Sequence, residues 1–156
     1  MDINNLIDQV KAQNWAIGHY AVFGSALMAY YKLREVPNID VVVDGELWEK
    51  LLINSSPDNE GFIHIGLIKV SNWWFAPTRK DIVTMIKEAE IIDGVPYIKL
   101  EEVLSYKKAL IDGKNKNDVA LLEEFLDKSK VKNINLGFNT YKPVIDDFVK
   151  DVELKL

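Results

Sequence analysis

The chain has 156 residues, of which 48% are hydrophobic, so it is long enough to form one domain with a sizeable core. Its net charge of −5 argues against a general nucleic-acid binder, and the lack of cysteine excludes disulfides, zinc–thiolate sites and a thiol nucleophile. No stretch reaches the ~18 apolar residues of a membrane span, and the N-terminal region does not read as a signal peptide. We therefore expect a cytoplasmic protein that is not associated with a membrane.

Hydrophobic periodicity predicts an α+β fold, in which helices flank a small mixed sheet of about four strands. The expected helices cover residues 3–13, 26–34, 46–53, 100–112, 117–128 and 143–152, and the expected strands cover 20–23, 38–43, 62–70 and 80–86. The segment 88–93 fits either a short helix or a short strand. A boundary near residue 99 separates a strand-rich part, 1–99, from a helical part, 100–156. Both parts are small, so we expect a single domain over 1–156.

The expected strand Tyr20–Phe23 runs directly into Gly24 and Ser25, and a helix follows. Glycine has no Cβ, so the backbone can turn sharply at Gly24 and a ligand can come close. Serine is a good helix N-cap, and the unpaired N–H groups of the first helical turn favour an anion such as a phosphate. This corner is therefore a candidate phosphate-binding site.

The next expected strand carries Asn38 and Asp40 near its start. Side chains alternate along a strand, so these two project from the same face with Cα atoms about 7 Å apart. Two neighbouring oxygen-bearing side chains make a candidate site for a hard cation. The alternative is an ordinary strand–helix–strand unit with a capping serine and a solvent-facing aspartate.

The order of these features resembles the nucleotidyltransferase fold superfamily. The pattern of that family is a hydrophobic residue, Gly, and Gly or Ser, then a gap of about ten residues and Asp-x-Asp on a strand. Gly24, Ser25 and Asp40 match the pattern, whereas Asn38 stands where the first metal-binding aspartate is expected. The resemblance also implies a third carboxylate on a later strand, adjacent to the first pair. Asp81, at the start of the expected strand 80–86, is the candidate, and an ordinary strand-end aspartate is the alternative.

Two charged residues fall within apolar helical stripes in the C-terminal part of the chain. Lys107 lies near the middle of one stripe and Asp118 lies at the N-terminal end of the other. A charge inside an apolar stripe is costly unless it is paired, so the two side chains are expected to lie together or to point jointly into a cleft. Alternatively, Asp118 serves the first turn of its helix and Lys107 extends its amine to solvent.

The run LEEVLSYKKALIDGKNKNDVALLEEFL, residues 100–126, resembles a segment of the nucleotidyltransferases of toxin–antitoxin and abortive-infection systems. Lys107 matches the helix lysine and Asp118 matches the following aspartate, although asparagines replace the usual charged residues in the turn. The resemblance implies that Asp40, Asp81 and Lys107 are catalytic. It also implies that Gly24, Ser25, Lys107 and Asp118 bind nucleotide, and that Asn38, Asp40 and Asp81 hold Mg²⁺.

The implied activity is transfer of a nucleotidyl group from an NTP to an acceptor, protein or RNA, with a partner protein from an adjacent gene. Two-metal chemistry of this kind clamps both the attacking and the leaving oxygen. Asn38 weakens the expected metal site, so a non-catalytic relative that binds nucleotide or a partner is the alternative, and a plain α+β domain is a third.

Aromatic side chains and a histidine complete the candidates. Trp73, Trp74 and Phe75 are able to stack on a base, although packing at a strand end is the more common role of such residues. His64 alternates with apolar neighbours, which favours a core or edge histidine over a ligand.

Overall fold

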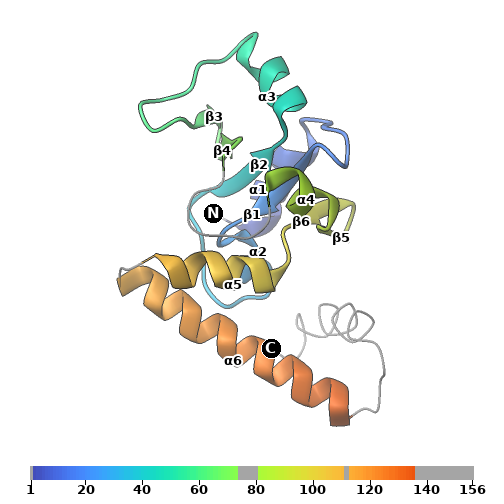
Figure 1. The fold of residues 1–156 in the computed structure, drawn as a ribbon, viewed down its shortest axis with the longest axis vertical. Helices are drawn as coiled ribbons and strands as arrows, with labels where there is room; N and C mark the ends of the chain where they lie inside the picture. The colour runs from blue at the N-terminus through green and yellow to red at the C-terminus, as the bar shows by residue number, and fades with distance from the viewer. Residues whose placement is uncertain (1, 74–80, 111–112, 136–156) are drawn as a thin grey trace.

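A computed structural model describes residues 2–73, 81–110 and 113–135 of the chain. Over these residues it shows an α+β fold with six helices and one six-stranded mixed sheet, whose strand order is β3-β4-β2-β1-β6-β5 (Figure 1). The helices are α1 (Ile3–Lys11), α2 (Ala26–Tyr30), α3 (Gly45–Leu52), α4 (Ile82–Lys87), α5 (Leu100–Ala109) and α6 (Gly113–Asn135). The strands are β1 (Tyr20–Phe23), β2 (Ile39–Val43), β3 (Ile63–Ile65), β4 (Ile68–Ser71), β5 (Glu90–Ile92) and β6 (Val95–Tyr97).

The fold class is confirmed, but the sheet has more strands than the expected four. The segment expected as one strand, 62–70, is a hairpin, because Gly66 adopts φ +59° and turns the chain between β3 and β4. The segment 88–93, for which the sequence fitted either a helix or a strand, contributes strand β5, which pairs antiparallel with β6. Both differences arise at turns, where the hydrophobic pattern alone does not show a reversal.

The expected strand 80–86 is wrong, because this segment forms helix α4. Asp81 is the N-cap of the helix, and its carboxylate accepts a hydrogen bond from the backbone N–H of Thr84 at 2.7 Å. The β-branched run at 82–84 favours a strand, but capping by Asp81 and the helical spacing of Ile82, Met85 and Ile86, which pack on the core, outweigh it. Asp81 is therefore an exposed helix cap and not a strand residue.

Strand β2 lies at the centre of the sheet, antiparallel to β1 and parallel to β4. One of its faces is wholly apolar, because Ile39, Val41 and Val43 are each 0% exposed. The other face carries Asp40, which is only partly buried. The sheet thus places one carboxylate among apolar strands near the end of β1.

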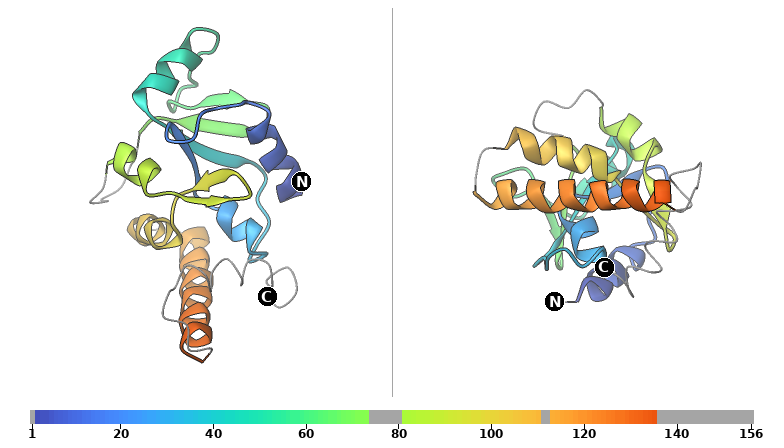
Figure 2. Two further views of the ribbon diagram at one scale, coloured as in Figure 1. Left: turned by 90° about the vertical axis from the view of Figure 1, so that its right-hand side faces the viewer. Right: turned by 90° about the horizontal axis from the view of Figure 1, so that it is seen from below.

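Helices α5 and α6 lie side by side below the sheet (Figures 1 and 2). The inner side of α6 is anchored by Leu122 and by Phe125, whose ring lies 4.6 Å from that of Tyr31 at the end of α2. Helix α6 begins at Gly113, earlier than the expected residue 117, and the expected helix 143–152 lies outside the described residues. Within the described part of the chain, no helix has the length and apolar character needed to cross a membrane.

Candidate functional site

Gly24 and Asp40 meet at the end of the β1–β2 pair. Phe23 is the register partner of Asp40, and Gly24 follows it with φ +76°. A Cβ atom at Gly24 would lie 3.0 Å from Oδ2 of Asp40, which is closer than such atoms normally approach. Glycine is therefore needed here both for the backbone conformation and for the approach of the carboxylate.

Ser25 occupies the N-cap position of α2, but its side chain makes no capping hydrogen bond. Its hydroxyl oxygen instead accepts hydrogen bonds from Nη2 of Arg34 at 2.5 Å and from Nζ of Lys107 at 3.0 Å. The N–H groups of a first helical turn have no partner within their helix. The serine side chain accepts from none of the first-turn N–H groups of this five-residue helix. Ser25 thus stands at the expected N-cap position but without a side-chain capping bond, and phosphate binding at this corner stays a prediction.

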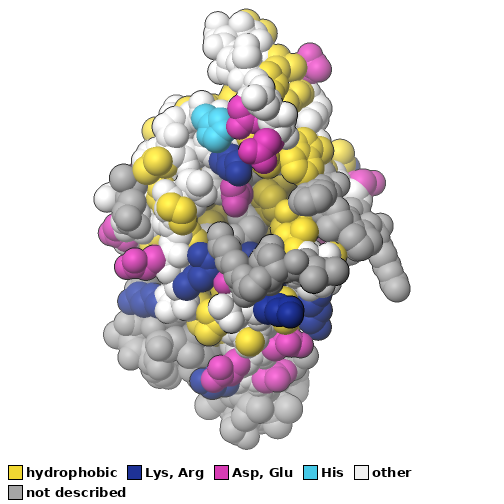
Figure 3. Space-filling model, turned by 90° about the vertical axis from the view of Figure 1, so that its left-hand side faces the viewer, with side chains coloured by type: hydrophobic (Ala, Val, Ile, Leu, Met, Phe, Trp, Pro, Cys, Tyr) yellow, Lys and Arg dark blue, Asp and Glu magenta, His cyan; other side chains and the backbone are white. Residues whose placement is uncertain are grey.

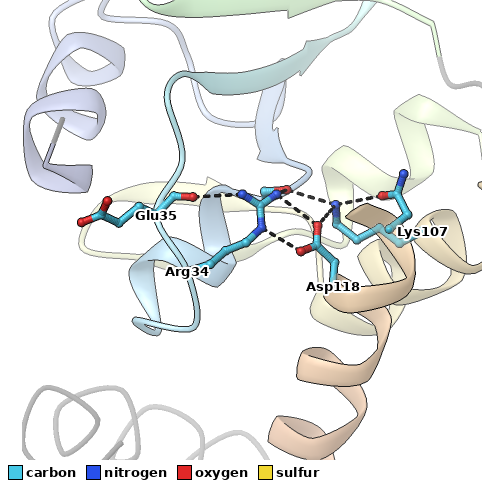
Figure 4. A network of polar contacts seen from close by, with 6 residues as sticks. Arg34, Glu35, Lys107 and Asp118 are labelled. Carbon is cyan, nitrogen blue, oxygen red and sulfur yellow. Dashed lines mark hydrogen bonds and ion pairs between the residues drawn. The ribbon is translucent and has the colours of Figure 1, made fainter. Parts of the chain in front are cut away.

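Behind this corner lies what we call the buried cluster, in which Ser25 and Arg34 are partly buried and Lys107, Asn115 and Asp118 are buried (Figure 4). Nζ of Lys107 lies 2.8 Å from Oδ2 of Asp118, and the two residues are only 4% and 1% exposed. The predicted pairing of Lys107 and Asp118 is thus confirmed. The alternatives are wrong: Lys107 does not reach solvent, and Asp118 is the sixth residue of α6, beyond its first turn.

Arg34 completes the cluster and was not predicted from the sequence. Its Nε and Nη2 atoms donate to the two oxygens of Asp118 at 2.7 and 3.0 Å, and Nη1 donates to the carbonyl of Glu35 at 2.9 Å. Such a bidentate contact suits the planar guanidinium. Arg34 reaches Asp118 because α2 ends at Tyr30, before the expected residue 34. Lys32 then takes φ +63° and redirects the chain.

The buried cluster carries one net positive charge, since Arg34 and Lys107 face the single carboxylate of Asp118. Burial on its own raises the pKa of Asp118, but the hydrogen bonds and positive charges of Arg34 and Lys107 outweigh it, so the pKa lies below its ordinary value. Asp118 is therefore ionised at neutral pH. The remaining positive charge lies beside Ser25 and favours an anion at the corner.

Asp40 has a basic neighbour in the sheet. Its register partner on β4 is Lys69, so the two side chains project from the same face of adjacent strands about 4.8 Å apart. The Nζ atom of Lys69 lies 4.2 Å from the centre of the Phe62 ring. Burial, and then the charge of Asp40, raise the pKa of Tyr106. The Tyr106 ring packs edge-on against the Phe23 ring, with ring centres 5.8 Å apart. A cation, not a second carboxylate, is thus the strand neighbour of Asp40.

The other predicted metal ligands give little support to a two-metal centre. Asn38 lies just before β2, which begins at Ile39, and its amide oxygen carries no charge. The Thr84 backbone N–H holds the pKa of Asp81 below its usual range, so this carboxylate is ionised but serves the helix. The site thus combines one strand aspartate, one asparagine and a lysine. Metal binding by Asn38, Asp40 and Asp81 stays a prediction. The strand position expected for Asp81, on which this prediction was based, is not found.

Trp73 and His64, two of the aromatic and histidine candidates, lie at the β3 edge of the sheet. Trp73 packs against Phe62 with ring centres 5.1 Å apart, whereas Trp74 and Phe75 lie outside the described residues. His64 is exposed on β3, as expected of an edge histidine, and its Nε2 lies 2.6 Å from Oδ2 of Asp58. The backbone N–H of Phe62, followed by the His64 contact, lowers the pKa of Asp58 to about 2.

Acidic and basic side chains are mixed on the face of the molecule shown in Figure 3, where they lie close to a histidine and to hydrophobic side chains. No large patch of one sign is visible among the described residues of this face.

A cavity of about 540 Å³ opens on the far side of Arg34, between the start of α1 and the loop that follows α2. Its lining includes Tyr30, Lys32, Arg34 and Glu35. The volume falls within the range of small-molecule sites. Arg34 therefore connects this cavity with the buried cluster.

We compared the chain with protein-family models, with curated proteins and with solved structures, and none of them matches. Function must therefore be argued from the geometry of the site itself.

Proposed function

We propose that the chain is a nucleotidyltransferase-like protein that binds a nucleoside triphosphate, with the phosphates at the Gly24–Ser25 corner. The observation that carries the proposal is the convergence of predicted site residues from distant segments. Gly24 touches Asp40, and Ser25 is bonded to Lys107, which is paired with Asp118. An accidental resemblance would not require residues more than 80 positions apart to meet at one corner.

Lys107 acts in this proposal as a positioning residue. Its amine is buried and is already engaged by Ser25, Asn115 and Asp118, so it does not need to touch the ligand. By fixing the serine hydroxyl, Lys107 and Arg34 fix the corner whose backbone N–H groups receive the phosphate. Their excess positive charge adds a long-range attraction for the triphosphate.

Binding without an efficient transfer step is the form of the proposal that the geometry favours. Hard cations are held by several oxygen ligands, and their affinity depends on the charge of those ligands. Asp40 has Lys69 as its strand neighbour and Asn38 two residues before it. Neither of these side chains adds a negative charge, so Asp40 alone would hold Mg²⁺ only weakly. The protein then acts as a non-catalytic nucleotide- or partner-binding relative of the transferases.

An active transferase is the second candidate, because a carboxylate does stand directly beside the phosphate corner. In this form Asp40, with the amide oxygen of Asn38, would hold a single Mg²⁺ on the triphosphate. The acceptor would be a protein or an RNA. A partner protein from an adjacent gene stays a prediction in both forms.

Calorimetric titration with ATP, CTP, GTP and UTP, each with and without Mg²⁺, tests the binding proposal. We expect at least one nucleotide to bind, with little dependence on Mg²⁺. Gly24→Ala should abolish binding, while Gly94→Ala should not, although both glycines have a positive φ of similar size. Absence of binding by all four nucleotides would refute both forms of the proposal.

Asn38→Asp distinguishes the two forms. A second carboxylate two residues from Asp40 should tighten Mg²⁺ binding if the two side chains share a site. Incubation of the wild type and of Asn38→Asp with α-labelled nucleotides then measures transfer. Label on an acceptor from the wild type, lost in Asp40→Asn, would favour the transferase; label only from Asn38→Asp would favour the non-catalytic form.

A further inference from the structure

A group of three potential metal ligands lies at the other end of the β1–β2 pair. His19 directly precedes β1, and Asp44 and Glu46 lie at the start of α3. One ligand atom from each residue lies within 4.8 Å of the other two. In a search of the described residues, these three side chains form a group of potential ligands that is compact enough to hold an ion.

Backbone contacts hold two of the three residues in place. The Asp44 N–H donates to the His19 carbonyl at 2.9 Å, which extends the β1–β2 ladder by one step. Oδ1 of Asp44 accepts from the N–H of Leu47 at 2.9 Å and so caps α3. This bond leaves Oδ2 turned towards Nδ1 of His19, at 2.5 Å. The position of the carboxylate is therefore set by the fold and not only by its contact with the imidazole.

Glu46 supplies a second carboxylate to the same imidazole nitrogen, with Oε2 at 3.3 Å from Nδ1. Ligands at about 2.1 Å from a tetrahedral metal ion lie about 3.4 Å apart, so this separation already suits a shared ion. The Asp44 oxygen would need to withdraw by somewhat less than 1 Å. Glu46 is 63% exposed and is free to adjust.

Water can reach an ion between these side chains, because His19, Asp44 and Glu46 are 39%, 17% and 63% exposed. The donor set also balances charge, because two carboxylates and a neutral imidazole neutralise a divalent cation. Imidazole suits Zn²⁺ and its first-row neighbours, whereas Mg²⁺ prefers oxygen ligands alone.

We propose that His19, Asp44 and Glu46 form a binding site for a divalent transition-metal ion such as Zn²⁺. The site lies about 16 Å along β1 from Gly24, from five residues at about 3.3 Å each. It is therefore independent of the nucleotide proposal.

The chain offers an internal control, since it contains only two histidines. His64 also contacts a carboxylate, that of Asp58 at 2.6 Å, but no compact group of three includes it among the described residues. If a histidine–aspartate pair were sufficient for metal binding, the two histidines would respond alike. If the third ligand matters, only His19 would respond.

Titration of the full chain with Zn²⁺ alone, followed by calorimetry and by NMR of the two imidazole rings, tests the proposal. We expect the Nδ1 resonance of His19 to shift at Zn²⁺ concentrations that leave His64 unchanged. His19→Gln and Glu46→Gln should each weaken binding about 10-fold or more, while His64→Gln and Asp40→Asn should not change it. Excess Mg²⁺ should not displace the Zn²⁺.

Equal responses of both histidines, or unchanged affinity in both His19→Gln and Glu46→Gln, would overturn the proposal in favour of nonspecific surface binding. Absence of Zn²⁺ binding below millimolar concentrations would overturn it in favour of a structural ion pair. Glu46 is largely exposed, so Glu46→Gln is expected to fold even if His19→Gln does not. Since Asp40→Asn leaves Zn²⁺ binding intact, failure of this proposal and failure of nucleotide binding are separate results.

Discussion

The two ends of the β1–β2 pair both carry charged groups, but they are built differently. At the Gly24 end, Ser25, Arg34, Lys107 and Asp118 come from segments far apart in the chain, and the ion pairs between them are largely buried. At the other end, the group around His19 is formed by residues that adjoin the same strand pair and that remain partly exposed. Buried charges depend on one another for stability, whereas exposed ones contribute little and are free to exchange a ligand.

The largest effect is expected from Asp118→Asn, which removes the single negative charge of the buried cluster. The buried Lys107 and the partly buried Arg34 then lack a counterion, which should lower the free energy of unfolding by about 3–5 kcal/mol. Urea unfolding measures the change. Asp127→Asn, an exposed position on the same helix, is the matched control and should stay within about 0.5 kcal/mol. Similar values for the two variants would show that the cluster is not held together by its charges.

Gly24→Ala should have the next largest effect on stability. Positive φ alone costs an alanine about 1–2 kcal/mol, and this cost applies equally to Gly94→Ala, at φ +81°. Gly24→Ala also forces its methyl group against Asp40, whereas a Cβ at Gly94 meets no atom within 4 Å. We expect a further loss of about 1 kcal/mol for Gly24→Ala over Gly94→Ala in urea unfolding. Equal losses would mean that Asp40 can move away from the corner.

Lys107→Met should change stability by no more than about 1 kcal/mol. Asp118 keeps its bidentate contact with Arg34, and the apolar methionine fills the volume of the lysine in a buried place. The asymmetry between Lys107→Met and Asp118→Asn is the direct sign of a cluster with one excess positive charge. Nucleotide titration of the same variant should show weaker binding, since Ser25 loses one of its two cationic donors. A loss of stability as large as that of Asp118→Asn would contradict the assignment of excess positive charge.

The sequence was sufficient to predict the parts of the site that lie on regular elements. Lys107 and Asp118 interrupt apolar helical stripes, and an unpaired charge in such a stripe is too costly to leave alone. Gly24 and Asp40 were predicted from the order of strand, corner and strand, and they meet because β1 and β2 pair directly. Hydrophobic periodicity, together with the free-energy cost of an unpaired buried charge, thus predicts contacts between distant segments.

The residues that prediction missed lie where the chain leaves regular structure. Arg34 follows a short helix, and its path depends on the positive φ of Lys32, which has no signal in the hydrophobic pattern. Lys69 became the neighbour of Asp40 only because a turn at Gly66 splits one expected strand into two. Asp81 was misplaced because the β-branched run after it was interpreted as a strand and its role as a helix cap was not considered. Turn geometry decided the first two of these cases, and a helix cap decided the third.

The smallest and most gradual effect is expected from acid. The pKa of Asp118 in the folded protein lies below its ordinary value, so the unfolded chain binds more protons than the folded one in this range. The stabilisation by Asp118 is therefore fully present above about pH 4, the ordinary pKa of aspartate, and is lost as the pH falls through the folded pKa. The free energy of unfolding should decline with decreasing pH there, and more steeply in the wild type than in Asp118→Asn.

Carboxylate NMR titration checks the cause of this decline directly. Asp118 should remain ionised at pH values that protonate ordinary exposed aspartates, as should Asp58, whose pKa of about 2 is set first by a backbone N–H and then by His64. The Asp58 side chain lies at the surface and is 36% exposed, so it shows whether a lowered pKa alone makes a residue important for stability. Asp58→Asn should reduce the acid sensitivity of unfolding less than Asp118→Asn does. Equal reductions would mean that a surface carboxylate contributes as much as the buried Asp118, and that burial does not distinguish the cluster at the Gly24 end.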